Sequence, residues 1–216
     1  MKKVLIIGAN GKIGKILAAK MKVSTEFQPI ALVRKEAQRL QFDQQQIEYR
    51  LGSLEGSTDD LETVMEDIDA IVFAAGSGGS TGDDKTLSVD LDGAVKVMES
   101  AKKLNIKRFI IISAIQADDR AFWEKSGIKG YYIAKHYADR VLKEIGLNYT
   151  IVRPGALLDE PGKGLITIDN PTVQRGVPRE DVADVVLTSL QQDNTIGKVI
   201  EFNEGDKPIK EVLNAL

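Results

Sequence analysis

The sequence lacks cysteine entirely and contains a single histidine, His136, among its 216 residues. The absence of cysteine excludes disulfide bonds, thiolate catalysis and cysteine-ligated metals, and one histidine argues against a metal site built from imidazoles. We therefore predict no metal site. A chain without cysteine is also compatible with the cytoplasm, which is the compartment that we expect.

Long hydrophobic runs and an excess of positive charge are missing as well. No apolar run approaches the length of a membrane span, and the run at residues 4–7 is too short for a signal peptide. The formal net charge of -3 provides no overall basic field for a nucleic-acid duplex or an anionic membrane. We expect neither partner. A homodimer is left open, because a helix face that dimerises has the pattern of any amphipathic helix.

Short apolar runs do recur, with helical patterns between them, and this alternation predicts a parallel sheet. The expected strands cover residues 4–7, 29–33, 47–51, 69–74, 109–112, 149–152 and 199–202, and the expected helices cover residues 12–21, 36–42, 59–66, 85–104, 131–145 and 179–191. We predict a single α/β domain over residues 1–216, with a doubly wound, mainly parallel seven-stranded sheet between two helical layers. Residues 154–178 carry four prolines and four glycines, which predicts an irregular segment over the substrate side.

Three glycines, Gly8, Gly11 and Gly14, follow the first expected strand as a helical pattern begins. Glycine permits a tight turn and close approach of a pyrophosphate, and the helix start presents free N–H groups to that anion. This context indicates a Rossmann-type dinucleotide site, although a glycine-rich turn can also be only a turn. The residues that we assign to the loop are Gly8, Asn10, Gly11, Lys12, Ile13 and Gly14.

The end of the second strand is basic, with Arg34 and Lys35, where NAD-specific sites usually carry a carboxylate. A guanidinium can bind a 2'-phosphate with two parallel donors, and Lys35 or Lys12 can add charge. The pattern favours NADP(H) over NAD(H). The alternative is a solvated basic strand end.

Other strand ends should meet at the same sheet edge, where ligands bind in open α/β sheets. The candidates that follow the third and fourth strands are Ser53, Leu54, Ala74, Ala75 and Gly76.

Together, the glycine turn, Ala74-Ala75-Gly76, a serine that ends the fifth strand, Tyr131-x-x-x-Lys135 and residues 149–155 resemble the atypical short-chain dehydrogenase/reductases. The likeness covers essentially the whole chain. It looks nearest to the short branch of NmrA-like and biliverdin/flavin-reductase-like proteins, whose members bind NADP(H). The resemblance implies that the backbone at Pro154 and Gly155 lies near the nicotinamide.

In catalytic members, a tyrosine transfers the proton, a lysine lowers its pKa and holds the nicotinamide ribose, and a serine orients the carbonyl. The resemblance carries these roles to Tyr131, Lys135 and Ser113. Residues four apart share a helix face, so Lys135 can lie beside Tyr131 and stabilise its phenolate. Such a pair also occurs by chance on amphipathic helices. Asp90 departs from the pattern, because it stands where many relatives use an asparagine in a proton relay, and a carboxylate cannot donate as an amide does.

The leading expectation is an NADP(H)-dependent oxidoreductase that passes hydride between the nicotinamide and a small carbonyl or quinone-like substrate. The short chain argues against a large nucleotide-sugar pocket. One alternative is a non-catalytic NADP(H) sensor of the NmrA-like kind. Another is a flavin or bilin reductase that uses Ser113 without an essential tyrosine.

Overall fold

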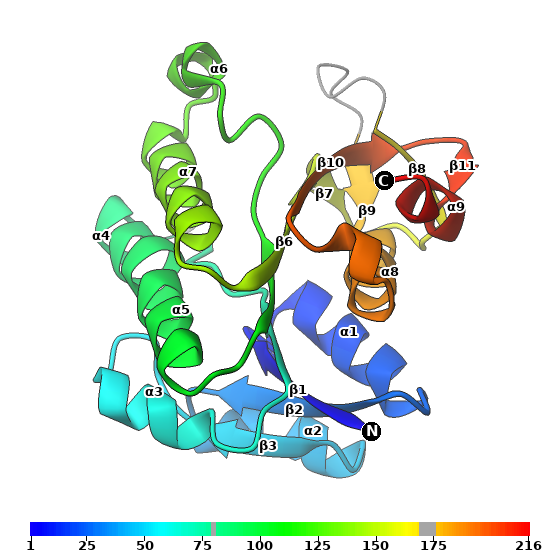
Figure 1. Cartoon of the computed structure of the whole chain (residues 1–216). Coiled ribbons are helices and arrows are strands. Elements are labelled where there is room, and N and C mark those ends of the chain that lie inside the picture. The colour runs from blue at the N-terminus through cyan, green and yellow to red at the C-terminus, as the bar shows by residue number, and fades with distance from the viewer. Residues whose placement is uncertain (79–80, 169–175) are drawn as a thin grey trace.

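The computed structural model describes residues 1–78, 81–168 and 176–216. Its central feature is a nine-stranded sheet with the order β11-β8-β10-β6-β5-β4-β1-β2-β3 (Figure 1). The strands of this sheet are β1 (Lys2–Ile7), β2 (Phe27–Val33), β3 (Glu48–Leu51), β4 (Ala70–Phe73), β5 (Arg108–Ile112), β6 (Asn148–Pro154), β8 (Leu165–Thr167), β10 (Lys198–Glu204) and β11 (Lys207–Pro208).

Seven of these strands, β10-β6-β5-β4-β1-β2-β3, run parallel to their neighbours, and they coincide with the seven expected strands. The predicted α/β class and parallel arrangement are confirmed. The predicted number of strands is wrong, because β8 pairs antiparallel with both β10 and β11 and extends the edge. Strands of three and two residues are too short to carry a periodic hydrophobic pattern, so the sequence contains no signal for them.

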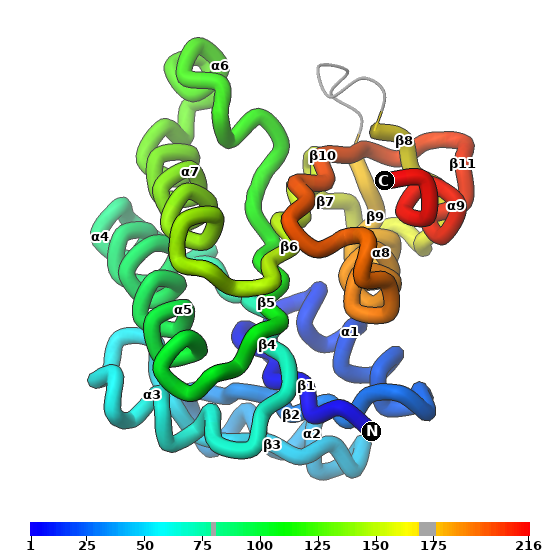
Figure 2. Tube along the Cα trace, in the orientation of Figure 1, coloured from blue at the N-terminus to red at the C-terminus, as the bar shows by residue number. Residues whose placement is uncertain are grey.

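Helices cover both faces of the sheet. They are α1 (Lys12–Lys22), α2 (Leu40–Gln44), α3 (Thr58–Val64), α4 (Asp83–Lys85), α5 (Gly93–Lys103), α6 (Arg120–Lys125), α7 (Lys129–Glu144), α8 (Arg179–Gln191) and α9 (Ile209–Asn214). One hydrophobic cluster joins α1, α8 and α9 to the sheet, and a second joins α3, α5 and α7 to its other face. Figure 2 shows α1 beside α8 on one side of the strands, and α5 beside α7 on the other.

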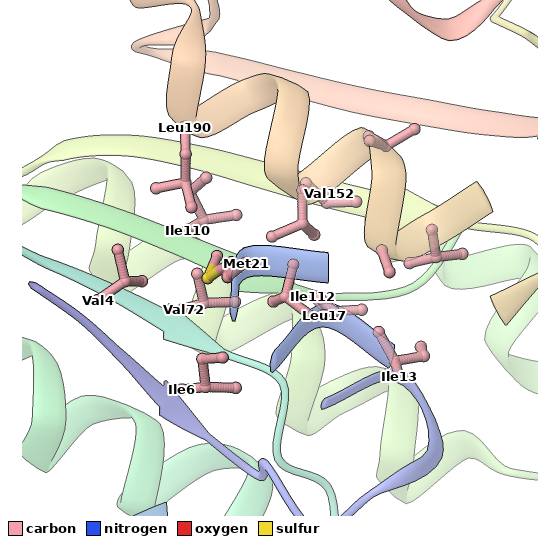
Figure 3. Packing of buried hydrophobic residues seen from close by; sticks show 14 of the residues in the cluster. Val4, Ile6, Ile13, Leu17, Met21, Val72, Ile110, Ile112, Val152 and Leu190 are labelled. Atoms are coloured by element: carbon pink, nitrogen blue, oxygen red, sulfur yellow. The ribbon is translucent and has the colours of Figure 1, made fainter. Parts of the chain in front are cut away.

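The central strands bury alternate side chains in opposite clusters, because successive residues of a strand point to opposite faces. Val4 and Ile6 lie in the cluster with α1, whereas Leu5 and Ile7 lie in the cluster with α5. Figure 3 shows Ile13, Leu17 and Met21 of α1 near the strand residues of the first cluster. All four side chains of residues 4–7 are almost completely buried, which explains why the run is apolar without alternation.

Helix boundaries differ from expectation where the backbone changes its winding. The expected helix 85–104 is divided into α4, the π-helical segment η2 (Thr86–Asp92) and α5. The expected helix 36–42 is a short 3-10 turn, η1 (Glu36–Gln38), followed by α2. Helices α6 and α9 have six residues each, fewer than two turns, and no periodicity predicted them.

The expected irregular segment at residues 154–178 contains more regular structure than predicted. It contributes β7 (Ala156–Leu158), β8 and β9 (Gly176–Pro178), and β7 pairs with β9 in a separate two-stranded sheet. Residues 169–175 of this segment lie outside the described residues. Within residues 1–78, 81–168 and 176–216, no helix is both long enough and apolar enough to cross a membrane.

Candidate cofactor and active site

The glycine turn after β1 is a tightly packed piece of backbone. Gly8 has a φ of +85°, a region that residues with a Cβ rarely adopt. A Cβ on Gly8 would also lie 2.6 Å from the backbone nitrogen of Ala75, in the turn after β4. A Cβ on Gly14 would overlap the carbonyl oxygen of Gly8. The turn, the start of α1 and the end of β4 therefore pack together only because these positions are glycine.

The first turn of α1 leaves its backbone donors available. Gly11 is the N-cap residue and provides no side-chain cap, and the first turn contains no acidic residue. An uncapped helix start carries free N–H groups and the positive end of the helix dipole, which favour an anion such as a pyrophosphate. This donor set fits the dinucleotide that the glycine motif predicts.

A cavity of about 290 Å³ opens at the carboxyl ends of the strands, beside this turn. Its volume is at the lower end of the range for ligand pockets, so it can hold part of a dinucleotide. The lining includes many predicted cofactor residues, namely Gly8, Asn10, Gly11, Arg34, Ser53, Leu54, Ala74, Ala75 and Gly76.

Other predicted cofactor residues lie outside this cavity. Lys12 is exposed and forms an ion pair with Asp159, with 2.5 Å between the charged atoms. Ile13 and Gly14 are buried under the turn, and Lys35 is exposed beside the cavity rather than in its lining. Of the three cations predicted to contact the cofactor phosphates, Arg34 lines the cavity, whereas Lys12 and Lys35 do not.

The backbone at the end of β6 is engaged within the sheet. The carbonyl of Pro154 accepts a hydrogen bond from Ile115 N at 3.0 Å, and Gly155 N donates to Phe202 O at 2.9 Å. These two backbone groups bond within the protein, and the contact with a nicotinamide that the resemblance implies for Pro154 and Gly155 stays a prediction.

Arg34 is held at the mouth of the cavity by its backbone. Gln38 Oε1 accepts hydrogen bonds from the backbone N–H groups of Arg34 and Lys35, at 2.9 and 3.2 Å. The guanidinium of Arg34 forms no hydrogen bond or ion pair with another described residue. An exposed guanidinium without a partner is free to bind an anion.

Two charged residues in the lining were not expected from the sequence. Lys85 and Glu55 form an ion pair with each other, and both face the cavity. The hydrogen bond that Lys85 donates to the Glu55 carboxylate raises the pKa of Lys85, whereas the nearby charge of Arg34 opposes this effect. No local motif marks Lys85, because only packing of η2 and α4 against the turn after β3 brings it to the cavity.

The expected Tyr131 and Lys135 lie together on α7. The Lys135 Nζ atom is 5.6 Å from the centre of the Tyr131 ring, donates to Ile112 O at 3.2 Å and lies 3.2 Å from Asp90 Oδ1. Burial raises the pKa of the Tyr131 hydroxyl, and the charge of Lys135 opposes this effect. Burial alone lowers the pKa of Lys135, but Tyr131 and Asp90 reverse the direction, so the lysine is held in its charged form.

Ser113, at the end of β5, donates its hydroxyl proton to Asp139 Oδ2 at 2.8 Å. Asp139 is completely buried and is also paired with Arg153, whose NH2 group lies 2.8 Å from the same carboxylate. Burial raises the pKa of Asp139, and Arg153 offsets part of this rise. The proton of Ser113 is thus directed into the protein, and the hydroxyl must leave Asp139 before it can donate to a substrate carbonyl.

Arg153 also connects this buried pair to the segment that follows β5. Its NH1 group lies 2.9 Å from Asp118 and 3.3 Å from Glu201. The hydrogen bond from Arg153 lowers the pKa of Asp118 to about 2. Neither Asp139 nor the ion pairs of Arg153 were predicted from the sequence. Asp139 lies one turn beyond Lys135 on an amphipathic helix, and a charged residue at such a position has no distinctive pattern.

Ser113, Tyr131 and Lys135 do not line the cavity, but Asp90 connects its lining to the pair of Tyr131 and Lys135. Asp90 Oδ2 accepts a hydrogen bond from the backbone of Ser77, a residue of the cavity lining, at 2.8 Å. Asp90 in turn contacts Lys135, which lies beside Tyr131. Among the described residues, no group of three or more His, Cys, Asp or Glu side chains could hold a metal ion. The arrangement offers an anion-binding turn, a nucleoside-sized cavity and a phenol–ammonium pair along one sheet edge.

Comparisons with known proteins agree with this geometry. The model of a family described as NAD(P)H-binding matches residues 8–193. A protein of Bacillus subtilis strain 168, named an uncharacterized sugar epimerase, is 46% identical over 99% of this chain and 100% of its own length. The solved structure of the oxidoreductase ylbE from Lactococcus lactis is 36% identical, has a TM-score of 0.89 and covers 99% and 96% of the two chains.

A more distant structure is that of ChuY, an anaerobilin reductase from Escherichia coli O157:H7. It has a TM-score of 0.81 at 22% identity and covers 96% of this chain and 100% of that one. At this identity the likeness establishes a common fold alone. The names of these proteins include both epimerase and reductase, so the relatives share a fold without sharing one named reaction.

Proposed function

Because this chain belongs to the NAD(P)H-binding family of Rossmann-fold oxidoreductases, we propose that it is an NADP(H)-dependent reductase of a small carbonyl or quinone-like substrate. The observation that carries the proposal is the pairing of Tyr131 with a buried, charged Lys135 directly beside the lining of the cavity. A phenol beside an ammonium can transfer a proton to a bound substrate. A site that only binds a dinucleotide does not need such a pair.

The residues that would hold the cofactor are those of the turn and the cavity. The N–H groups at the start of α1 and the glycine turn suit the pyrophosphate, and Arg34 with Lys85 suits a 2'-phosphate. The preference for NADP(H) is thus supported by two cations at the cavity, with Glu55 as the one carboxylate among the described lining residues. Bound NADPH would supply the hydride.

Tyr131 is proposed to supply the proton. When a substrate carbonyl carbon receives the hydride and its two electrons, the carbonyl oxygen takes the phenolic proton of Tyr131 and becomes a hydroxyl. The tyrosine is left as a phenolate beside the ammonium of Lys135, and a proton from water then restores the hydroxyl. Ser113 can orient the carbonyl only after its hydroxyl turns away from Asp139.

A second function, a non-catalytic NADP(H)-responsive regulator, is favoured by one observation. The groups that would assist Tyr131 are both engaged internally, Lys135 with Asp90 and Ser113 with Asp139. A protein that only binds the dinucleotide would retain the cavity and Arg34 without any use of Tyr131.

The two functions are distinguished by Tyr131→Phe, with Tyr132→Phe as the matched control. Tyr132 is the neighbouring tyrosine and packs edge-on against Phe122 at 5.3 Å. We expect Tyr131→Phe to retain NADPH affinity and to lose about 10²- to 10⁴-fold in NADPH oxidation with quinones and aldehydes, whereas Tyr132→Phe keeps most activity.

Unchanged turnover in Tyr131→Phe would exclude the tyrosine mechanism and favour direct hydride transfer, as in a flavin or bilin reductase. An absence of NADPH oxidation with every acceptor, together with tight binding that distinguishes NADPH from NADP⁺, would favour the regulator.

A further inference from the structure

The carboxylate of Asp90 is an unusual neighbour for a tyrosine–lysine pair. Asp90 is 0% exposed and belongs to the π-helical segment η2, which packs against α7. One oxygen, Oδ1, lies 3.2 Å from Lys135 Nζ, and the other accepts the Ser77 N–H at 2.8 Å. Both contacts fix the carboxylate between the lining of the cavity and the proton-transfer pair.

The charged and titratable groups around Tyr131 come from three elements. On α7, Lys135 lies one turn and Asp139 two turns along the helix, and Tyr132 is adjacent. Asp90 faces the site from η2, and the carboxylate of Asp83 in α4 lies beside Gly130, the residue before Tyr131. The hydroxyl of Tyr131 has no hydrogen-bond partner among the described residues. Its protonation is therefore governed by burial and by these charges.

The ion pair changes what Lys135 can do for Tyr131. An isolated ammonium beside a phenol favours the phenolate, but a carboxylate in contact with that ammonium contributes the opposite charge. The pair of Lys135 and Asp90 has no net charge, so burial of the tyrosine dominates, and the pKa of Tyr131 lies above its ordinary value. An asparagine at position 90 would hold the ammonium without cancelling its charge.

We propose that Asp90 is a positioning residue that neutralises Lys135 and thereby keeps the Tyr131 hydroxyl protonated at neutral pH. Tyr131 then carries the proton that reduction of a carbonyl requires. It is not in the phenolate form that oxidation of an alcohol requires. This inference deepens the proposed function, but its central statement concerns a protonation state and can be measured without turnover.

The test is an ultraviolet titration of tyrosinate in the wild type, in Asp90→Asn and in Asp92→Asn. Asp92 is the matched control, because it lies on the same segment and pairs with Lys96 at the surface. We expect Asp90→Asn to lower the pKa of one tyrosine by about 1–3 units and Asp92→Asn to leave all five unchanged. The shifted phase must vanish in Asp90→Asn/Tyr131→Phe, which assigns it to Tyr131.

A second variant shows that the effect passes through the lysine. Addition of Lys135→Met to Asp90→Asn removes the charge that the proposal requires, so the tyrosine should return to a high pKa. If Asp90→Asn is too unstable for titration, Asp90→Ser removes the same charge with a smaller side chain, and bound NADPH stabilises either variant.

A folded Asp90→Asn protein whose Tyr131 titrates as in the wild type would overturn the proposal, whatever its activity. A shifted titration in a protein that oxidises no NADPH would support the role of Asp90 and contradict the proposed function. In an active enzyme, we also expect the rise of the oxidation rate with pH to begin at a lower pH in Asp90→Asn than in the wild type, because the phenolate of Tyr131 then forms at a lower pH.

Discussion

Replacement of Arg34 by alanine tests the proposal that this side chain gives the cofactor site a preference for NADP(H). The guanidinium is exposed at the mouth of the cavity and has no partner in the described part of the chain, so its removal breaks no internal ion pair. Any loss of cofactor affinity in Arg34→Ala then comes from a lost contact with the bound cofactor. Only NADPH carries the 2'-phosphate that this side chain is proposed to bind, and NADH serves as the internal reference.

The size of the effect follows from the exposure of the site. A charge-assisted hydrogen bond contributes about 1.5–3 kcal/mol, which corresponds to about 10- to 150-fold in Kd. Arg34 is solvent-exposed, so salt screens the interaction, and Lys85 retains part of the positive charge. We therefore expect a loss at the lower end, about tenfold for NADPH at physiological salt, and less than about twofold for NADH.

Calorimetry or quenching of intrinsic fluorescence can measure the four Kd values for wild type and Arg34→Ala. Arg39→Ala is a suitable control, because Arg39 is an exposed arginine that pairs with Glu36 at 3.0 Å and does not line the cavity. Equal affinities for NADPH and NADH in the wild type, or equal losses for both in Arg34→Ala, would refute the assignment of Arg34 to the 2'-phosphate.

Two further predictions concern the network behind Ser113. Arg153→Met leaves the buried carboxylate of Asp139 without its cation and should destabilise the protein by about 3–5 kcal/mol, measured by denaturant unfolding; a loss below about 1 kcal/mol would contradict the ion pair. The pKa of Asp118 is lowered to about 2, so its contribution to stability is present above its ordinary value of 3.8 and is lost as the pH falls toward 2. Melting temperatures between pH 5 and 2 should therefore decline less steeply in Asp118→Asn than in the wild type, and parallel curves would exclude this linkage.

The fold was predictable because most of its seven parallel strands are short apolar runs that alternate with longer helical patterns. Strand β11 is only Lys207–Pro208, and strands of this length form through pairing with a neighbour rather than through a pattern of their own. Helix α6, with Trp123 buried against the aromatic cluster, is likewise stabilised by tertiary packing.

The sequence predicted those residues of the site that belong to a local motif. Gly8, Gly11 and Arg34 follow from the strand–turn–helix pattern, and the structure brings them to one cavity. Lys85 and Asp139 reach the site only through packing of distant segments, so no spacing in the sequence marks them. The hydrophobic pattern of this region predicts one continuous α-helix. It therefore does not predict the π-helical winding of η2, which brings Asp90 next to Lys135.

The central claim, that this protein transfers hydride from NADPH to a small acceptor, is tested most directly with NADPH deuterated at the transferred position. The wild-type protein should oxidise NADPH in the presence of at least one quinone or aldehyde. Single-turnover oxidation, which isolates the chemical step, should be slower with the deuterated cofactor, because that step breaks the C–H bond of the nicotinamide. Tight NADPH binding without any acceptor-dependent oxidation across the panel would contradict the account.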